Sequence, residues 1–436
     1  MYIACVFQCS WLAAILVSLQ MTSGFLTAND QCFDVCTCST QSWIVCTMRG
    51  LQSYPDFVFS VLPTEYIEID LFDNRFTEIP FGIFRNVNFP PDFSNEMYLL
   101  MQNNQISRIH NGAFLGLENI PLQLNLGHNR LTSISREFTR LRRLYSLSIE
   151  GNPLTVPGIP DDVIRDMFHN DFQVISLSSY ELLKKVMKYG QDRLYALYIY
   201  DINETRFDEG LFVKGQTKAL NILAIYNSAF SDFSEVLCNL DLGDFSVNMC
   251  WNVNDTTLQG CSQNNTVTLE IQNCATTDAL DPSAFFNAPL EGLKLSGHMN
   301  RVPRGLLSHW PYLATIYLTG DINGVQNDDF NHLTDLNHLV IVSDTITFLD
   351  NEAFNTNLKL QQLGFEGRGL LNNLPSSIKN LTLLTSLELP DMTCSCATMG
   401  ALKGGNYSSM YVSGNCKNIP GKSIKTYLNK DITACP

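Results

Sequence analysis

A spacing pattern recurs along this chain and restricts the folds that it can adopt. Its clearest copy is LQLNLGHNRLTSISREFTRL, residues 122–141, where leucines and one asparagine, Asn129, stand at fixed offsets. The central apolar residues of the clear copies are Ile69, Leu99, Leu124 and Leu147, and then Leu293, Ile316, Leu339, Leu363 and Leu387. The last five are 23, 23, 24 and 24 residues apart. Such a period indicates one structural unit stacked many times, and not a row of separate globular domains.

The spacing is that of a leucine-rich repeat, which consists of a short strand, a turn with an inward asparagine and a return segment. Each unit is too small to bury its own apolar face, so neighbouring units stack and share one continuous core. The sequence therefore predicts an α/β leucine-rich-repeat solenoid. We expect a curved horseshoe with a parallel β-sheet on its concave side and an irregular or helical convex side.

The middle of the chain keeps the period less strictly. We place Ile175, Leu197, Leu223, Phe245 and Leu269 at the same strand position, which gives about 14 repeats within residues 66–393. Region 155–290 is irregular, because the spacing there varies from 22 to 28 residues. Within it, residues 155–190 are predicted to form an insertion or helix.

Two kinds of side chain recur after the strands: a polar residue in the turn and a phenylalanine in the return segment. Inward asparagines should satisfy backbone groups that a buried turn leaves unpaired; they are Asn74, Asn104, Asn129 and Asn152. Ser228, Asp321 and Asp344 take the same offset later in the chain, so a smaller or charged group should replace the amide there. A row of phenylalanines should line the far side of the core: Phe84, Phe114, Phe138, Phe330 and Phe354.

Cysteine clusters flank the repeats. A stacked array exposes apolar surface at its two ends, which caps must cover. The clusters are Cys32, Cys36, Cys38 and Cys46 before the first repeat, and Cys394, Cys396, Cys416 and Cys435 after the last. We therefore predict a cysteine-rich N-terminal cap at 25–65 and a C-terminal cap at 394–436, both disulfide-bonded.

The first 24 residues are typical of a cleaved secretory signal peptide, because the apolar run Trp11–Leu19 precedes small residues near Gly24. No later segment has the roughly 18 apolar residues that a membrane span requires. The even number of cysteines that remains favours disulfides in an oxidising compartment. The sequence thus predicts a secreted, extracellular protein without a membrane span.

Sequons and net charge agree with that compartment. The chain has Asn-x-Ser/Thr sequons that predict a glycoprotein: Asn203, Asn254, Asn264, Asn380 and Asn406. The formal net charge is -15. So acidic a chain is a poor candidate for binding nucleic acid or anionic membrane.

The cysteine clusters, CFDVCTCSTQSWIVC at 32–46 and CSC at 394–396 with Cys416 and Cys435 behind it, also carry a resemblance. They resemble the caps of extracellular leucine-rich-repeat proteins, the superfamily of Toll-like receptors, Slit proteins and small matrix proteoglycans. The resemblance covers the chain from Cys32 to Cys435. It implies a curved, secreted, ligand-binding scaffold with no chemistry of its own.

A narrower likeness covers mainly residues 66–167. LQLNLGHNRLTSISREFTRL followed by LYSLSIEGNPLTVPGIPDDVIRDM is similar to arthropod proteins named after the non-catalytic subunit of decapod shrimp coelenterazine luciferase. That subunit is itself a leucine-rich-repeat protein that accompanies a separate catalytic chain. The likeness implies, as an alternative, an accessory subunit that stabilises a secreted enzyme, and it carries over no site residue.

Four further cysteines lie on the irregular repeats. Cys238 and Cys261 follow consecutive strand centres by 15 and 16 residues, and Cys250 and Cys274 each follow one by five. Matching positions on adjacent repeats are about 5 Å apart, within the range of a disulfide. We therefore expect Cys238 to pair with Cys261, and Cys250 with Cys274. The alternative for the second pair is two buried free thiols in the asparagine position.

No catalytic or metal-binding motif is evident in the sequence. It contains no H-E-x-x-H or G-x-S-x-G motif. GNCKNIPGKS at 414–423 has Cys416 where a phosphate loop requires glycine, and residues 321–329 lack the spacing of a calcium loop. We therefore predict no cofactor, no metal site and no enzymatic activity.

Strand side chains alternate, so the residues beside the inward leucines face the concave surface. Exposed aromatic rings mark protein-binding surfaces, although tyrosine also favours strands in general. Four rings on neighbouring repeats favour a contact surface for an extracellular protein or a glycan. The predicted contact residues are Phe72, Tyr98, Tyr195, Tyr198, Tyr200, Asp201, Tyr226 and Tyr317. Replacing Tyr198 and Tyr226 by alanine is expected to weaken binding with little effect on stability.

Overall fold

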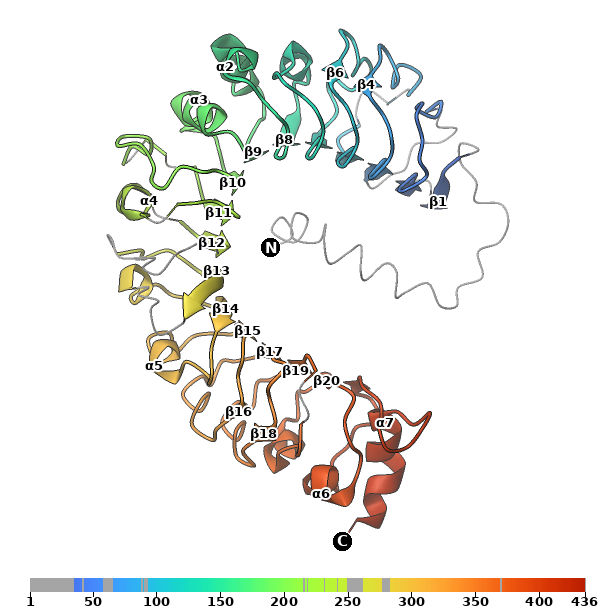
Figure 1. Cartoon of the computed structure of the whole chain (residues 1–436), viewed down its shortest axis with the longest axis vertical. Coiled ribbons are helices and arrows are strands. Elements are labelled where there is room, and N and C mark those ends of the chain that lie inside the picture. The colour runs from blue at the N-terminus through green and yellow to red at the C-terminus, as the bar shows by residue number, and fades with distance from the viewer. Residues whose placement is uncertain are drawn as a thin grey trace.

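The computed structural model describes residues 35–435 apart from 41–42, 58–65, 88, 90–92, 215, 218, 231, 241, 249–261, 277–282 and 369–370. The chain winds into an open horseshoe whose inner wall is a continuous β-sheet (Figure 1). This sheet has 17 strands. Its first strand, β1 (Thr37–Thr40), is antiparallel to its neighbour, and the strands that follow are parallel to one another. The predicted solenoid with a parallel concave sheet is therefore confirmed.

Each parallel strand is short and is followed by a return segment behind the sheet. The parallel strands are β2 (Trp43–Val45), β3 (Ile67–Asp70), β5 (Met97–Leu100), β7 (Leu122–Asn125), β8 (Leu144–Ser148), β9 (Val174–Leu177), β10 (Ala196–Tyr200), β11 (Ile222–Tyr226), β12 (Asp244–Asn248), β13 (Thr268–Thr276), β14 (Gly292–His298), β15 (Thr315–Thr319), β17 (His338–Val342), β19 (Gln362–Glu366), β20 (Ser386–Glu388) and β21 (Tyr411–Val412). Two small parallel pairs stand on return segments: β4 (Glu78–Ile79) with β6 (Arg108–Ile109), and β16 (Gly324–Val325) with β18 (Phe348–Leu349).

The strand centres assigned from the sequence are register partners from Ile69 to Leu387. The irregular middle is included, since Leu197 is the partner of Ile175 on one side and of Leu223 on the other. The row of paired strand centres continues into the two cap regions. Ile44 of β2 pairs with Ile69, and Val412 of β21 pairs with Leu387. The N-terminal cap region therefore adds β1 and β2 to the sheet of the repeats, and the C-terminal cap region adds β21.

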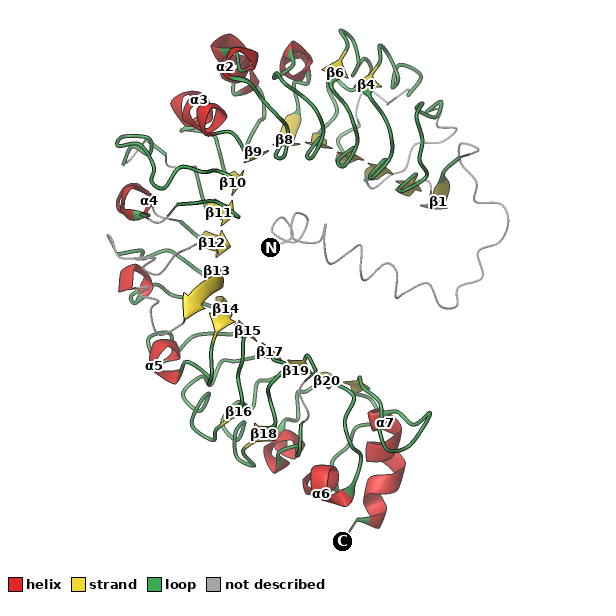
Figure 2. Cartoon of the chain, in the orientation of Figure 1, coloured by secondary structure: helices red, strands yellow, loops and turns green. Residues whose placement is uncertain are grey.

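Helices lie on the convex side, away from the strands (Figure 2). They are the 3-10 helices η1 (Arg136–Arg140), η2 (Val156–Gly158), η4 (Ser283–Phe285), η5 (Ser376–Asn380) and η6 (Gly400–Leu402), and the α-helices α2 (Asp161–Met167), α3 (Tyr180–Gly190), α4 (Ser234–Asn239), α5 (Arg304–Leu307) and α6 (Cys396–Met399). The chain ends in α7 (Ile424–Thr426), η7 (Tyr427–Asp431) and η8 (Ile432–Ala434). Region 155–190 contains helices, as predicted, and α3 buries its apolar side in the common core.

One apolar core runs the length of the solenoid between the sheet and the return segments. The inward residues of the strands belong to it, as Leu124, Leu197 and Leu339 illustrate with at most 2% exposure. The predicted phenylalanine row is part of the same core. Phe84, Phe114, Phe138, Phe330 and Phe354 are all at most 2% exposed. Burying the two rows against each other removes apolar surface that a single repeat could not cover.

The inward asparagines join neighbouring repeats by hydrogen bonds. Asn129 Nδ2 donates to the carbonyl of Met101 in the preceding repeat and to that of Leu126 in its own, both at 3.0 Å. Its Oδ1 accepts the N–H of Ile106 at 2.9 Å. Equivalent bonds are made by Asn74, Asn104 and Asn152. The expectation that these amides satisfy buried turn backbone is confirmed.

Later repeats replace the amide in a way that the sequence predicts only in part. Ser228 is 2% exposed and its Oγ accepts the N–H of Ile202 at 3.1 Å, as expected. The assignments of Asp321 and Asp344 are wrong, because both side chains are exposed. Beside Asp344, the buried polar residue is Ser343, whose hydroxyl donates to a carbonyl at 2.9 Å. A carboxylate would lose its hydration in that turn at high free-energy cost, whereas a hydroxyl loses little.

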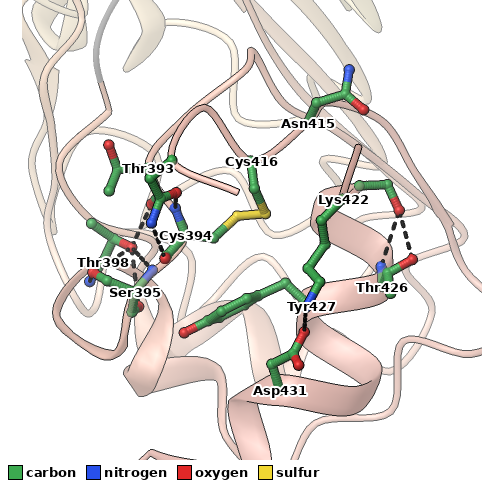
Figure 3. The surroundings of a disulfide bond; sticks show 12 residues. Thr393, Cys394, Ser395, Thr398, Asn415, Cys416, Lys422, Thr426, Tyr427 and Asp431 are labelled. Carbon is green, nitrogen blue, oxygen red and sulfur yellow. Dashed lines mark hydrogen bonds and ion pairs between the residues drawn. A yellow bond between two sulfur atoms is a disulfide. The ribbon is translucent and has the colours of Figure 1, made fainter. Parts of the chain in front are cut away.

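The described disulfides close the two ends of the array. They are Cys36–Cys46, Cys394–Cys416 and Cys396–Cys435. Figure 3 shows the Cys394–Cys416 bond beside the ion pair between Lys422 and Asp431, whose charged atoms are 2.9 Å apart. Cys32 and the side chain of Cys38 lie outside the described residues.

The middle cysteines are described only in part. Cys238 is disulfide-bonded. Cys250, Cys261 and the side chain of Cys274 lie outside the described residues, so both pairings predicted there stay predictions. Among the helices that the structure describes, none combines the length and the hydropathy needed to cross a membrane.

Candidate binding surface on the concave face

The concave face of the sheet carries an apolar cluster of its own, on the side opposite the core. Its buried members are Val174, Ala196, Tyr198, Ile222 and Ala224, against which Tyr145, Tyr195, Tyr200 and Tyr226 pack half-buried. We call these residues the tyrosine patch. They come from β8 to β11, the part of the sheet midway along the horseshoe (Figure 1).

Strand alternation places the patch on this face. In β10, Leu197 and Ile199 point into the core, so Ala196, Tyr198 and Tyr200 point the other way. β11 repeats the arrangement in register with β10. Strands that are apolar on both faces, such as ALYIY and ILAIY, are typical of sheets that are covered on both sides.

Tyr198 differs from the sequence expectation. It is only 5% exposed, so its ring does not stand free on the surface. Its partners on the adjacent strands are Ser176 and Ala224, whose small side chains leave room for the larger rings of the patch to close over it. Burial raises the pKa of its phenol, and the neighbouring phenol of Tyr226 adds to the effect.

Tyr200 and Tyr226 are two half-buried rings of the patch on adjacent strands. Tyr200 and Tyr226 stack with their ring centroids 4.8 Å apart. Burial, followed by the proximity of Tyr226 and Glu150, raises the pKa of the Tyr200 phenol. At the edge of the patch, the Tyr195 hydroxyl accepts a hydrogen bond from Asn221 Nδ2 at 3.3 Å. The Tyr200 phenol therefore stays protonated at neutral pH and can act as a hydrogen-bond donor and acceptor.

Carboxylates border the patch. Asp244 lies close enough to Tyr198, and Asp201 close enough to Tyr200, for their charges to act on these phenols. Asp201 has a left-handed backbone with φ of 53°, and Asn227 takes the same turn position on the next repeat with φ of 46°. Their side chains are joined by a hydrogen bond from Asn227 Nδ2 to Asp201 Oδ1.

Glu150 follows β8 at the border of the patch. Its side chain fits beside Gly127, where an added Cβ would lie 2.2 Å from Glu150 Oε1. Its other oxygen, Oε2, is buried and has no hydrogen-bond partner among the described residues. Burial first, and then the charge of Asp201, raise the pKa of Glu150 to about 7. This carboxylate therefore changes its charge near neutral pH.

Serine hydroxyls lie next to the patch on β8 and β9. Ser146, Ser148 and Ser176 are each 1% exposed, and their Oγ atoms have no hydrogen-bond partner within the described part of the chain. Ser148 and Ser176 are register partners, and Ser176 in turn is the partner of Tyr198. Buried hydroxyls without a partner carry a free-energy cost.

The predicted contact residues fall into two sets. Tyr195, Tyr198, Tyr200, Asp201 and Tyr226 come together at the patch. Phe72, Tyr98 and Tyr317 lie elsewhere, after β3, on β5 and on β15. Of these, Tyr98 is half-buried with its hydroxyl 2.5 Å from Glu96 Oε2, and Tyr317 is 37% exposed.

The small and aliphatic members of the patch, Val174, Ala196, Ile222 and Ala224, were not predicted from the sequence. Neither were the three serines. The available signal was the lack of alternation in β10 and β11, where apolar residues occupy both faces.

The sequons are placed as follows. Asn203, Asn264, Asn380 and Asn406 are exposed, and Asn254 lies outside the described residues. Asn203 follows Asp201 by two positions, at the border of the tyrosine patch. Over the residues that can be described, no group of three His, Cys, Asp or Glu side chains is arranged to hold a metal ion.

Comparison with known proteins agrees with the geometry of the repeats. A leucine rich repeat model matches residues 95–154, and a BspA type leucine rich repeat region model matches residues 224–361. The crystal structure of the TLR13-ssRNA13 complex superposes with a TM-score of 0.52 at 16% identity, covering 88% of this chain and 65% of that one. The fold is a leucine-rich-repeat solenoid.

A curated relative of the solenoid is leucine-rich repeat-containing protein 3 of Danio rerio. It is 27% identical over 140 residues, which are 31% of this chain and 48% of that protein. The solenoid thus spans about half the length of this relative. These matches give no support to the likeness with the luciferase subunit.

Proposed function

We propose that this solenoid is a secreted, non-catalytic scaffold that binds a protein partner through the tyrosine patch. The observation that carries the proposal is the second apolar cluster, Val174, Ala196, Tyr198, Ile222 and Ala224, on the face opposite the core. The core needs apolar residues on one face of these strands only. A second apolar face is favoured where another surface covers it.

The residue types of the patch support a protein as the partner. Tyrosine buries a large area at low entropic cost and is enriched at the centres of protein interfaces. The curvature of a solenoid also gives an extended concave surface on which a partner can be held by several repeats at once.

Secretion is supported by the covalent chemistry. The described disulfides at the two ends, together with bonded Cys238, suit an oxidising compartment. Four described sequons are exposed, where an oligosaccharide could be attached. The TLR13 neighbour was solved with single-stranded RNA. A net charge of -15 repels phosphates, so RNA is a poor ligand for this chain.

The test is capture of the partner with matched tyrosine variants. The tagged full chain is incubated with extracellular fluid of its source, cross-linked and purified, and the attached proteins are identified. The test variant is Tyr200→Ser with Tyr226→Ser, in the patch. The control is Tyr312→Ser, at a ring that is 65% exposed and outside the sheet.

We expect the patch variant to capture at least about tenfold less of one protein than the native chain does, which corresponds to a loss of about 1.4 kcal/mol in binding free energy. The control variant should capture as much of that protein as the native chain. Equal capture by both variants would contradict the proposal. A stoichiometric catalytic chain among the captured proteins would favour the alternative of an accessory subunit. Capture that glycosidase treatment of the fluid abolishes would identify a glycan ligand instead.

A further inference from the structure

The concave strands carry carboxylates and almost no lysine or arginine. Their carboxylates are Glu68, Asp70, Asp244, Glu270, Glu366 and Glu388. Among all strands of the described sheet, Lys294 is the one lysine or arginine, and its Nζ lies 2.8 Å from Glu270 Oε1. The chain has 28 lysines and arginines. Every other lysine or arginine in the described part of the chain therefore lies outside the strands of this sheet.

The tyrosine patch lies inside this negative surface. Glu150, Asp201 and Asp244 approach it from three different repeats, close enough for their charges to act on Tyr198 or Tyr200. A partner that covers the patch would cover these carboxylates as well. Burying them without a counter-charge would be costly, so a neutral or acidic partner is disfavoured.

The rings of the patch point to the same conclusion. Tyr200 and Tyr226 are half-buried and stacked, and the carboxylates of Asp201 and Asp244 lie beside the patch. A guanidinium group carries a fixed positive charge and stacks on aromatic rings. Arginine therefore matches both the charge and the rings of this surface.

We infer that the tyrosine patch binds a cationic segment of a polypeptide, with arginine or lysine side chains lying over Tyr200 and Tyr226 and pairing with Asp201 and Asp244. The inference rests on the proposed function and adds the chemistry of the partner. Charge complementarity of this kind speeds association and excludes acidic partners.

The test uses a short synthetic peptide of alternating arginine and leucine. Its matched control replaces each arginine by citrulline, which keeps the shape and about three of the five N–H donors, has a carbonyl oxygen in place of one NH2 group, and removes the charge. Binding of both peptides to the full chain is measured by fluorescence anisotropy at about 0.15 M salt, where distant charges are largely screened.

The matched protein variants remove the same net charge from different places. The test variant is Asp201→Asn with Asp244→Asn, at the patch. The control is Asp192→Asn with Glu209→Gln, at two exposed residues outside the sheet. Asparagine fits the left-handed turn at position 201, since Asn227 occupies the same turn on the next repeat. Thermal unfolding of both variants shows whether they keep the fold.

We expect the arginine peptide to bind the native chain, the patch variant to bind it about tenfold more weakly and the control variant within about twofold. Citrulline should abolish binding. Equal weakening by both variants would show only the general attraction of an acidic protein, and would overturn the inference. So would citrulline binding as tight as arginine binding, or no binding of the arginine peptide. In those cases the proposed function still stands if partner capture depends on Tyr200 and Tyr226.

Discussion

Tyr200 and Tyr226 stack across adjacent strands on the concave face, with ring planes 19° from parallel. The two residues are register partners in β10 and β11, so the strand pairing itself brings their rings together. Rings that are already held in place lose little conformational freedom when a partner covers them. The stack therefore favours binding and also stabilises the free solenoid.

The stack can be measured by a double-mutant cycle. We expect Tyr200→Ala and Tyr226→Ala to be non-additive, with a coupling of about 0.5–1.5 kcal/mol in the free energy of unfolding. The measurement is urea unfolding of the native chain, both single variants and the double variant. Additive effects would mean that the rings do not interact in solution.

The burial of Tyr198 leads to a second stability prediction. Because this ring is 5% exposed, we expect Tyr198→Ala to destabilise the solenoid by about 2–4 kcal/mol, as for other buried large side chains. Tyr312→Ala, at a ring that is 65% exposed, should change stability by less than about 0.5 kcal/mol. From the sequence, replacing Tyr198 together with Tyr226 is expected to leave stability nearly unchanged, whereas the burial of Tyr198 predicts a large loss. Equal unfolding midpoints for Tyr198→Ala and Tyr312→Ala would contradict the prediction from burial.

Much of the fold could be predicted because it follows from local periodicity. The offsets of Leu124 and Leu126 recur along the chain, and each recurrence needs the same strand and turn. The inward polar group is an amide such as that of Asn129 in the early repeats and a hydroxyl such as that of Ser228 later. The register of Leu197 with Ile175 and Leu223 could be read in the same way, although the spacing there is irregular. Stacking of repeats forces equivalent residues into one row.

The candidate surface could be predicted only in part, because it depends on contacts between repeats. Alternation correctly puts Tyr198 on the concave face, yet its burial depends on the size of Ser176 and Ala224 on the adjacent strands. In a later repeat, the buried polar residue is likewise Ser343 and not Asp344, the residue expected from the spacing. The spacing of the repeat gives the approximate position, but the free-energy cost of burying a charge decides which of the two neighbours points inward.

The asparagine ladder gives a third prediction. Asn129→Ala would leave three carbonyls and one N–H without this partner inside a buried turn. Each buried unsatisfied group costs about 1–3 kcal/mol, and relaxation of the turn should limit the total to about 3 kcal/mol. We expect this loss in urea unfolding, against no measurable change for exposed Asn111→Ala. A small effect at Asn129 would mean that water replaces the amide.

Glu150 makes stability depend on pH. Its pKa is about 7 in the folded chain, against an ordinary value of 4.5. Between these values the folded chain holds the proton and the unfolded chain has lost it, so stability falls as pH rises and then levels off above pH 7. Glu150→Gln removes this loss. We expect the variant to match the native chain near pH 4 and to exceed its stability above pH 7 by about 1–2 kcal/mol, after allowing for solvent near a half-buried side chain.

The control for Glu150 is Glu209→Gln, at an exposed residue outside the sheet. It should change stability by less than about 0.5 kcal/mol at both pH values. Thermal unfolding across the pH range supplies the measurement. A pH-independent difference between Glu150→Gln and the native chain would show that packing, and not proton binding, accounts for the change.

The cysteines give the last prediction, which also decides between the two interpretations of the irregular repeats. Thiol counting on the denatured, unreduced secreted protein should find no free thiol if Cys250 bonds to Cys274. Peptide mapping without reduction should recover the described bonds, Cys36–Cys46, Cys394–Cys416 and Cys396–Cys435, together with Cys238 bonded to Cys261. Bonds that cross-link adjacent repeats stabilise the fold by a few kcal/mol, because they reduce the conformational entropy of the unfolded chain. They would do so where the spacing of the repeats is least regular. Two free thiols at Cys250 and Cys274 would instead mean that these side chains serve as buried substitutes for the inward asparagine.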